Sequence, residues 1–362
     1  IIKINNYKDE AQERLIIEEL ATNLIGVKIA SEKINKLKAK QMEILKKDLS
    51  SFVEKLPFKL TGAQLRTIND ISSDLSKVKP MRRLVQGDVG SGKTVVAAVS
   101  MYISTKNNSQ SVLLCPTEVL AEQHYKNFTE WFENTNIKIE LLTGKMSAVI
   151  RKDIYQRLEE GKIDILIGTH AVFQDKVKMK NLGLVIVDEQ QRFGVKQRFD
   201  LVKKSSNKIM PHQLFMTATP IPRTLAMTIF ADLDVSKIDE MPPGRKPVET
   251  LVFSDKKKNE IVKRLENVCS RGNQVFWLCT MIEESENLDV QAAEEAKIWI
   301  KENTSKLNIG LVHSKLSKDE RDKAIEKFRS GKIDVLVCTT VIEVGMDVPN
   351  ASLIVIENAE RL

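Results

Sequence analysis

Residues 87–94 of this chain read Gly-Asp-Val-Gly-Ser-Gly-Lys-Thr, which is the pattern of a phosphate-binding P-loop. The glycines would let backbone N–H groups turn toward an anion at the start of a helix, where the helix dipole favours negative charge. The Lys93 ammonium would neutralise the β- and γ-phosphates of ATP, and the Thr94 hydroxyl would ligate a bridging Mg²⁺. The expected nucleotide contacts are Gly87, Asp88, Val89, Gly90, Ser91, Gly92, Lys93 and Thr94.

The alternative interpretation of this segment is a glycine-rich connection between a strand and a helix. Leu84-Val85 would be the strand, and residues 95–105 would be the helix. A plain connection requires neither the lysine nor the threonine. The complete motif in this context therefore favours a nucleotide site.

Two adjacent carboxylates follow the apolar run at residues 184–187. Asp188 would hold Mg²⁺, directly or through water, and Glu189 would orient and deprotonate the attacking water. An acidic strand end in solvent is the alternative. The P-loop upstream favours the metal site, because the carboxyl ends of α/β strands are where such sheets bind ligands.

The pattern around these motifs predicts an α/β fold with parallel sheets. Residues 57–245 alternate short apolar strands with amphipathic helices, and residues 246–362 resume the alternation after Pro242-Pro243-Gly244, a plausible linker. Residues 1–56 carry apolar side chains at helical spacing and predict a helical extension that stops near Pro57. The expected strands are 84–85, 112–115, 163–167, 184–187, 213–216, 250–253, 274–278, 334–337 and 353–356.

The two halves of the chain repeat one another. Residues 161–169 are matched 170 residues later by residues 331–339, and residues 181–188 are paralleled by residues 350–357. Two such segments in the same order predict two copies of one α/β unit. The P-loop occurs in the first copy, so we expect ATP to be bound by the first unit and sensed by the second.

Composition restricts the class of protein. No apolar run approaches the roughly 20 residues that span a bilayer, so no membrane partner is expected. The formal net charge is +7, which permits a polyanionic partner without requiring one. The four cysteines lack the spacing of metal ligands and are interpreted as reduced core residues of a cytoplasmic protein.

Three further segments resemble the RecG helicases, a bacterial family of superfamily 2. They are Asp-Glu-Gln-Gln-Arg-Phe-Gly-Val at 188–195, Met-Thr-Ala-Thr-Pro-Ile-Pro-Arg-Thr-Leu-Ala at 216–226 and Thr-Thr-Val-Ile-Glu-Val-Gly-Met-Asp-Val-Pro-Asn-Ala at 339–351. The resemblance implies two RecA-like P-loop lobes, the second incomplete at its C-terminal end. It also implies a monomeric, nucleoid-associated, ATP-driven translocase on branched double-stranded DNA, acting on stalled forks and Holliday junctions in recombination and repair.

The resemblance also implies roles for individual residues. Gln64 would read adenine, Gln191 would join the catalytic set and couple it to DNA, and Gly345 and Asp347 would approach the nucleotide. Thr217, Thr219 and Arg223 would couple hydrolysis to domain movement; the alternative is a proline-rich turn. Ordinary strand-to-helix turns remain the alternative for the expected DNA contacts, which are Pro116, Thr117, Thr169, His170, Thr339 and Thr340.

Some features depart from the family pattern. Gln191 stands where histidine is usual, and Ser314 and Thr280 replace a usual glycine and a frequent proline. The resemblance implies that the family's arginine-rich motif, which reaches the γ-phosphate, would lie beyond residue 362 and that its wedge domain would precede residue 1. We therefore expect residues 1–362 to bind Mg-nucleotide but to hydrolyse it poorly. The other functions considered are an RNA helicase of the same superfamily and a nucleotide-gated DNA scaffold that does not translocate.

Overall fold

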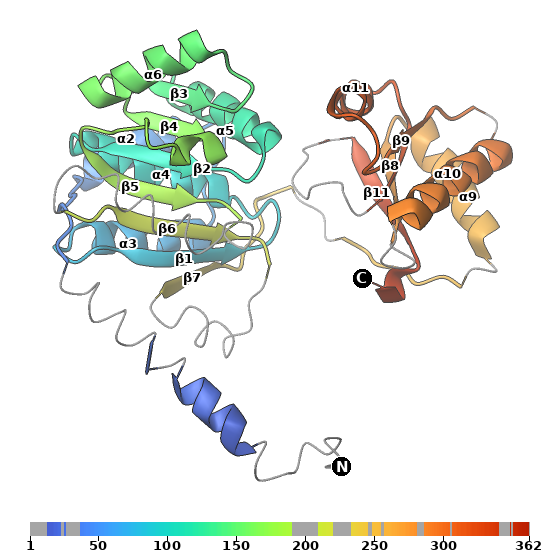
Figure 1. The fold of residues 1–362 in the computed structure, drawn as a ribbon, viewed down its shortest axis with the longest axis horizontal. Coiled ribbons are helices and arrows are strands. Elements are labelled where there is room, and N and C mark those ends of the chain that lie inside the picture. The colour runs from blue at the N-terminus through green and yellow to red at the C-terminus, as the bar shows by residue number, and fades with distance from the viewer. Residues whose placement is uncertain are drawn as a thin grey trace. The chain divides into compact units, whose positions relative to one another are not determined.

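The computed structural model divides into two units, Ile1–Lys246 and Pro247–Leu362, and each is described by itself (Figure 1). The structure describes residues 13–22, 25–26, 37–189, 209–219, 233–244, 248–254, 257–280, 286–304, 306–339, 348 and 350–361.

The first unit is built on a seven-stranded sheet in which every pair of neighbouring strands is parallel. The strand order is β3-β4-β2-β5-β6-β1-β7. Because all strands point the same way, their carboxyl ends share one edge of the sheet. The strands are β1 (Arg82–Gly87), β2 (Gln110–Leu114), β3 (Ile139–Leu142), β4 (Ile165–Gly168), β5 (Leu182–Val187), β6 (His212–Thr217) and β7 (Asp234–Ile238).

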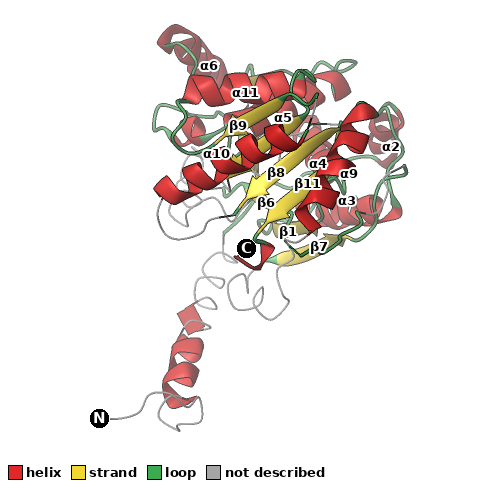
Figure 2. Ribbon diagram, turned by 90° about the vertical axis from the view of Figure 1, so that its right-hand side faces the viewer, coloured by secondary structure: helices red, strands yellow, loops and turns green. Residues whose placement is uncertain are grey.

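Helices cover both faces of this sheet, as its near-continuous apolar strands require (Figures 1 and 2). On one face the apolar cluster includes Ile165 and Ile167 of β4 and residues of α2 (Lys46–Glu54), α3 (Gly62–Leu75), α4 (Lys93–Lys106) and α5 (Glu118–Trp131). On the other face Leu166 packs with residues of α6 (Ala148–Glu160) and the short helix η1 (His170–Phe173).

The second unit contains a four-stranded parallel sheet in the order β11-β8-β10-β9. Helices α9 (Lys258–Ser270) and α10 (Glu286–Asn303) share one apolar cluster with the sheet, and α11 (Lys318–Arg329) shares another. The strands are β8 (Gln274–Cys279), β9 (Ile309–Val312), β10 (Val335–Thr339) and β11 (Ala351–Glu357), followed by the short helix η4 (Ala359–Arg361).

The two sheets share one topology. The order β11-β8-β10-β9, read backward, matches β3-β4-β2-β5 strand for strand, and α9, α10 and α11 follow the places of α4, α5 and α6. The predicted α/β class with two parallel sheets is thus confirmed, and the repeat seen in the sequence corresponds to a repeat of structure.

Several expected elements differ from the structure. Residues 250–253 form no strand, and residues 38–45 form neither helix nor strand. The helix expected to run to Pro57 ends at Glu54, the last residue of α2, whereas residues 13–22 are helical as predicted. Strands β3, β7 and β9 were not predicted, because each is short and only partly buried, which weakens its apolar signal.

The segment before α2, residues 38–45, is held on the first unit by long-range hydrogen bonds. Ala39 N–H donates to the Val78 carbonyl at 2.6 Å, and the buried Met42 donates its N–H to the Leu75 carbonyl at 2.8 Å. The Lys40 carbonyl accepts from Nε2 of the buried His212 at 2.8 Å. These bonds give the segment the backbone partners that a helix would otherwise have supplied.

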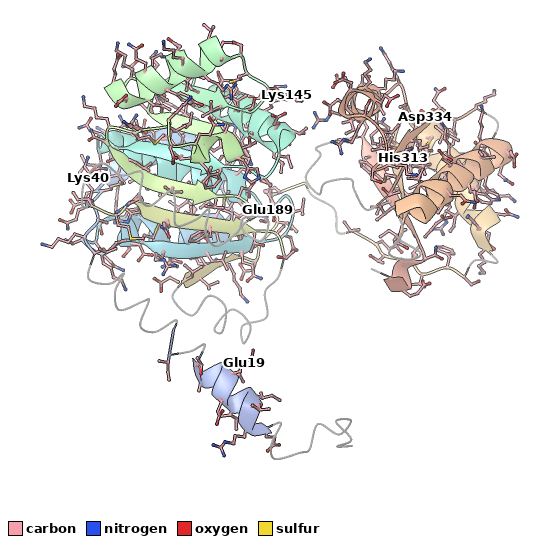
Figure 3. The ribbon with its side chains drawn as sticks, in the orientation of Figure 1. Glu19, Lys40, Lys145, Glu189, His313 and Asp334 are labelled. Atoms are coloured by element: carbon pink, nitrogen blue, oxygen red, sulfur yellow. The ribbon has the colours of Figure 1, made fainter. Side chains whose placement is uncertain are left out.

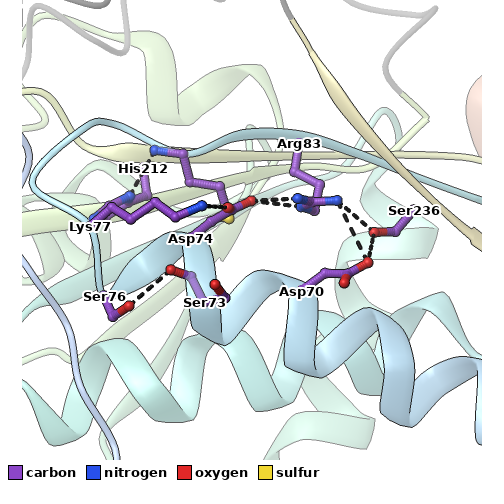
Figure 4. A network of polar contacts seen from close by, with 9 residues as sticks. Asp70, Ser73, Asp74, Ser76, Lys77, Arg83, His212 and Ser236 are labelled. Carbon is purple, nitrogen blue, oxygen red and sulfur yellow. Dashed lines mark hydrogen bonds and ion pairs between the residues drawn. The ribbon is translucent and has the colours of Figure 1, made fainter.

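A buried polar network fixes α3 against the sheet (Figure 4). The Arg83 guanidinium of β1 donates to the Asp74 carboxylate at 2.8 Å and to the Ser236 hydroxyl of β7 at 2.7 Å. The same hydroxyl donates to Asp70 at 2.7 Å, and Lys77 donates to Asp74 at 2.8 Å. The network holds α3, which carries Gln64, beside the strand that leads into the P-loop.

Candidate nucleotide-binding site

Sequence-predicted site residues gather at the carboxyl edge of the first sheet. The P-loop follows β1, Thr217 ends β6, and Asp188 follows β5, and these three strands are neighbours in the order β5-β6-β1. Glu189, labelled in Figure 3, comes next. Parallel strands therefore bring together side chains that are up to 130 residues apart in the sequence.

The P-loop has the backbone of an anion cradle. Gly90 and Gly92 have φ values of 78° and 86°, which side-chain-bearing residues rarely adopt. Gly92 caps α4, so the first N–H groups of this helix face the loop. The Lys93 ammonium donates to the Gly87 and Asp88 carbonyls at 2.7 and 3.0 Å, and the buried Ser91 hydroxyl has no hydrogen-bond partner among the described residues. These groups fit a bound phosphate.

Gln64 supports the P-loop from α3. It is buried, its Oε1 accepts from Thr61 N–H at 2.8 Å, and its Nε2 donates to the Ser91 carbonyl at 2.8 Å. A Cβ at position 92 would lie 2.1 Å from this nitrogen, so the close approach requires glycine there. The role of Gln64 in reading adenine stays a prediction, and it would require these two bonds to be exchanged.

Asp188, directly after β5, has a hydrogen-bond partner on each of its carboxylate oxygens. Its Oδ1 accepts from Glu189 N–H at 3.1 Å, and its Oδ2 lies 2.9 Å from Nε2 of His124 on α5. Both side chains of this pair are nearly buried. Burial, with Asp188 nearby, raises the pKa of the Cys115 thiol well above its ordinary value, which keeps this cysteine in its neutral form.

Glu189 and the turn after β6 complete this edge of the sheet. Glu189 has a φ of 48°, an unusual backbone conformation for a residue with a side chain. The hydroxyls of Thr217 and Thr219 form a hydrogen bond of 2.9 Å, and Thr219 N–H also donates to the Thr217 hydroxyl at 3.2 Å. Gln86 of β1 donates to the Thr219 carbonyl at 3.4 Å, so the strand before the P-loop contacts this turn.

The expected DNA contacts of the first unit follow β2 and β4 at the same sheet edge. Thr117 caps α5 by accepting from Leu120 N–H at 3.2 Å, and Pro116 precedes it. Thr169 is buried, and the exposed His170 begins η1. In the second unit, Thr339 ends β10 and is buried.

Sequence reasoning did not identify His124. A lone histidine in an amphipathic helix is ordinarily a packed or exposed residue, and its partner Asp188 lies 64 positions away. The signal available was its helical spacing from Ala121 and Phe128, which are buried on the same face of α5. Five predicted site residues lie outside the described residues, namely Gln191, Arg223, Thr340, Gly345 and Asp347.

The described residues contain no group of three or more His, Cys, Asp and Glu side chains that could hold a metal ion by themselves. Mg²⁺ ordinarily takes only one or two protein ligands beside nucleotide phosphates, so Thr94 and Asp188 fit such a partial site. No helix in the described part of the chain is both long and apolar enough to cross a bilayer.

Comparison with known families and proteins agrees with this geometry. Residues 61–228 match the DEAD/DEAH box helicase family, and residues 256–361 match the helicase conserved C-terminal domain. The chain is 48% identical over 364 residues to the ATP-dependent DNA helicase RecG of Haemophilus influenzae, covering 98% of this chain and 52% of that protein. It is 46% identical over 357 residues to RecG of Escherichia coli K12, covering 97% of this chain and 51% of that protein.

A solved structure of RecG bound to a three-way DNA junction has a TM-score of 0.82 and 39% identity to this chain. The match covers 97% of this chain and 46% of that one. The chain therefore spans about half the length of the relatives it matches. The motifs quoted above, the two parallel sheets and these likenesses along almost the whole chain lead to one conclusion, which is that this chain belongs to the RecG family.

Proposed function

We propose that this chain is the motor of an ATP-driven double-stranded DNA translocase that remodels branched DNA, such as stalled forks and Holliday junctions. One observation carries the proposal, which is that the P-loop after β1 and the Asp188-Glu189 pair after β5 flank the Thr217 turn at one sheet edge. Nucleotides bind at this edge in open α/β sheets. The relative solved with a three-way DNA junction supports branched DNA as the substrate.

In this proposal ATP lies on the P-loop. Lys93 exchanges its bonds to the Gly87 and Asp88 carbonyls for bonds to phosphate oxygens, while Thr94 and Asp188 hold Mg²⁺. The bound ion neutralises charge on the β- and γ-phosphates. The Ser91 hydroxyl, which has no partner within the described part of the chain, and the glycine backbone supply neutral donors around the same phosphates.

Glu189 is proposed to orient and deprotonate the attacking water. Its place directly after Asp188, at the sheet edge that also carries the P-loop, supports this role. Glu189→Gln retains the size of the side chain and removes the base. We expect it to bind Mg-ATP normally and to lower turnover by about 10²–10⁴-fold. Turnover near the wild-type rate would exclude Glu189 as the base.

DNA is proposed to be held through its phosphates by the turns after β2 and β4. The Thr117 and Thr169 turns lie on adjacent strands at the sheet edge that also carries the P-loop. Contacts of this kind position a duplex without reading its sequence. If about five phosphates are contacted, the logarithm of the affinity should fall with the logarithm of salt concentration with a slope near −4.5. A shallow slope would contradict binding through the backbone.

A displacement assay tests the proposal as a whole. The full-length protein that includes residues 1–362 is mixed with a forked duplex DNA and ATP, and strand displacement is measured beside phosphate release. We expect duplex DNA to stimulate hydrolysis and the fork to be remodelled. Stimulation by RNA alone would identify an RNA helicase instead. Hydrolysis with binding but without displacement would identify a nucleotide-gated scaffold, and either result would contradict the proposal.

The same measurements test further expectations from the sequence. Residues 1–362 by themselves are expected to bind Mg-ADP but to show little DNA-stimulated hydrolysis, and rapid turnover by this segment would contradict that. We also expect the protein to act as a monomer at the nucleoid of a bacterium; the relatives that it matches are bacterial proteins. Light scattering at working concentration, with and without DNA, would check the monomeric state.

A further inference from the structure

His124 is a buried polar side chain on the apolar face of α5. Its exposed fraction is 5%, and its Nε2 lies 2.9 Å from the Asp188 carboxylate, itself 7% exposed. Ala121 and Phe128, one turn to either side, are fully buried apolar residues on the same face. An apolar side chain would satisfy packing at position 124. The histidine therefore requires a reason beyond core filling.

The backbone places the two partners rigidly. Strands β2 and β5 are neighbours, with Leu114 paired to Val187, and Asp188 N–H donates to the Leu114 carbonyl at 2.9 Å. Helix α5 begins shortly after β2 and is capped by Thr117. The Phe128 ring meets the imidazole edge to face, with centroids 6.2 Å apart. Strand pairing and the capped helix place the imidazole opposite the carboxylate before any ligand arrives, and the ring contact adds packing alone.

Hydrogen bonding determines what the histidine can do. A carboxylate accepts hydrogen bonds and donates none, so His124 must carry its proton on Nε2 to bond Asp188. Its other ring nitrogen, Nδ1, is buried without a partner among the described residues. With Glu189 N–H on Oδ1 and His124 on Oδ2, both carboxylate oxygens are oriented, and each keeps a lone pair for a metal ion or its water.

We propose that His124 is a positioning residue that holds the Asp188 carboxylate in the orientation needed to bind the Mg²⁺ of Mg-nucleotide. The inference rests on the proposed function in that Asp188 is taken to hold this ion. His124 contacts neither the nucleotide nor the ion itself. It acts as do the partners that orient metal ligands in other proteins, whose loss typically lowers metal affinity or activity by 10–100-fold.

The test compares three variants in the Mg²⁺ dependence of nucleotide binding. His124→Leu removes the donor at similar volume. His124→Gln retains an N–H that can reach the carboxylate. Phe128→Leu disturbs the same helix face without touching Asp188, and so controls for packing. Binding of a fluorescent ADP is titrated with Mg²⁺ and repeated in EDTA, and thermal unfolding is measured without nucleotide.

We expect His124→Leu to raise the Mg²⁺ concentration at half-saturation by about 10–100-fold while leaving ADP binding in EDTA unchanged. His124→Gln should restore most of the Mg²⁺ affinity. Phe128→Leu should lower the unfolding temperature without shifting the Mg²⁺ requirement. If His124→Leu does not fold, His124→Asn, whose amide is too short to reach the carboxylate, replaces it.

Two results would overturn the inference. One is an unchanged Mg²⁺ requirement in His124→Leu or His124→Asn, and the other is an equal shift in Phe128→Leu, which would mean that packing alone is responsible. Failure of the proposed function looks different. In that case the wild-type protein itself would bind ADP with no dependence on Mg²⁺, or Lys93→Ala would leave ADP binding unchanged.

Discussion

In both units a glutamine side chain forms hydrogen bonds to the turn that joins a helix to the next strand, α6 to β4 in the first unit and α11 to β10 in the second. In the first unit Gln110 Nε2, at the start of β2, donates to the Leu158 and Ile163 carbonyls at 3.1 and 2.7 Å. In the second unit Gln274 Nε2, at the start of β8, donates to the Phe328 and Ile333 carbonyls, both at 2.6 Å. These two residues lie 170 positions after Leu158 and Ile163. Each glutamine ties a strand to the helix and strand that follow it.

A second shared device lies next to this one. The Asp164 carboxylate accepts from Lys138 N–H at 2.7 Å, and the Asp334 carboxylate accepts from Asn308 N–H at 2.7 Å. In each unit the preceding helix ends near a glycine in the left-handed region, Gly161 with φ 76° and Gly331 with φ 73°. Polar groups far from the nucleotide site are thus alike in both units, because each satisfies the same backbone atoms.

The units differ where chemistry is expected. Helix α4 begins at Lys93 after the P-loop, whereas the corresponding α9 begins at Lys258 without a glycine loop before it. Asp188 faces a histidine, whereas its counterpart Glu357 forms an ion pair with Lys258. The Lys258 ammonium also lies over the Trp299 ring, 4.6 Å from its centroid.

This difference indicates how one fold supports two tasks. In the first unit the lysine is held by carbonyls of the loop, and the carboxylate is oriented by hydrogen-bond donors, which fits the proposal that the two receive a nucleotide and its ion. In the second unit the lysine and the carboxylate neutralise each other. The backbone is nevertheless alike in both units at the residue after each carboxylate, since Glu189 and Asn358 have φ values of 48° and 50°.

The largest expected effect separates the two lysines. In the full-length protein, Lys93→Ala should lower ATP turnover by at least about 10²–10³-fold and leave the fold intact, because it removes a charge directed at the phosphates. Lys258→Ala should leave the affinity for Mg-ADP unchanged. Phosphate release and fluorescent-ADP binding measure both. Equal losses of nucleotide affinity in the two variants would mean that the second unit also contacts the nucleotide, which would break the comparison.

A smaller effect is expected from the two glutamines. Each replacement by leucine removes the side-chain donor from two carbonyls. The Leu158 and Phe328 carbonyls still accept from Gly161 and Gly331 N–H at 3.1 Å, so we expect a cost of about 1–3 kcal/mol for the one remaining carbonyl. Gln110→Leu should be the more destabilising, since its Oε1 also accepts from Asn181 N–H at 3.0 Å. Hydrogen exchange should locate the loss in the first unit for Gln110→Leu and in the second for Gln274→Leu. If either variant lost protection from hydrogen exchange in both units, the two glutamines would not act separately, each within its own unit.

The Lys258–Glu357 pair should contribute about 1 kcal/mol to the second unit, because its side chains are 36% and 20% exposed and solvent screens their charges. Lys258→Met retains the stem over the tryptophan rings and removes the charge. Denaturant unfolding should show a small loss in the free energy of unfolding for Lys258→Met. Adding Glu357→Gln to this variant should cause no further loss. Additive losses would show that the two side chains do not act as a pair.

The smallest effect is a pH dependence in the first unit. Burial lowers the pKa of His212 below its ordinary 6.5, opposed in part by its bond to the Lys40 carbonyl. The unfolded chain therefore takes up a proton near pH 6.5 that the folded chain takes up only at lower pH. The stability is fully present above pH 6.5 and falls as the pH drops below it. His212→Gln should flatten this fall in urea unfolding; an unchanged slope would assign it to other groups.

The sequence by itself determined what local pattern encodes. The P-loop, the Asp188-Glu189 pair and the alternation of strands and helices each lie within one short segment, and the repeat at 161–169 and 331–339 predicted the shared topology. Such signals survive without tertiary structure because periodicity and glycine content are properties of neighbouring residues.

Only the tertiary structure decided which distant groups meet. His124 and Asp188 are 64 positions apart, Gln64 and Ser91 are 27 apart, and Lys40 and His212 are 172 apart. No local pattern encodes such a pair, because each partner is placed by the packing of its own helix, strand or loop. The same cause explains the errors at residues 38–45 and at β7, where backbone pairing with the rest of the first unit outweighs local propensity.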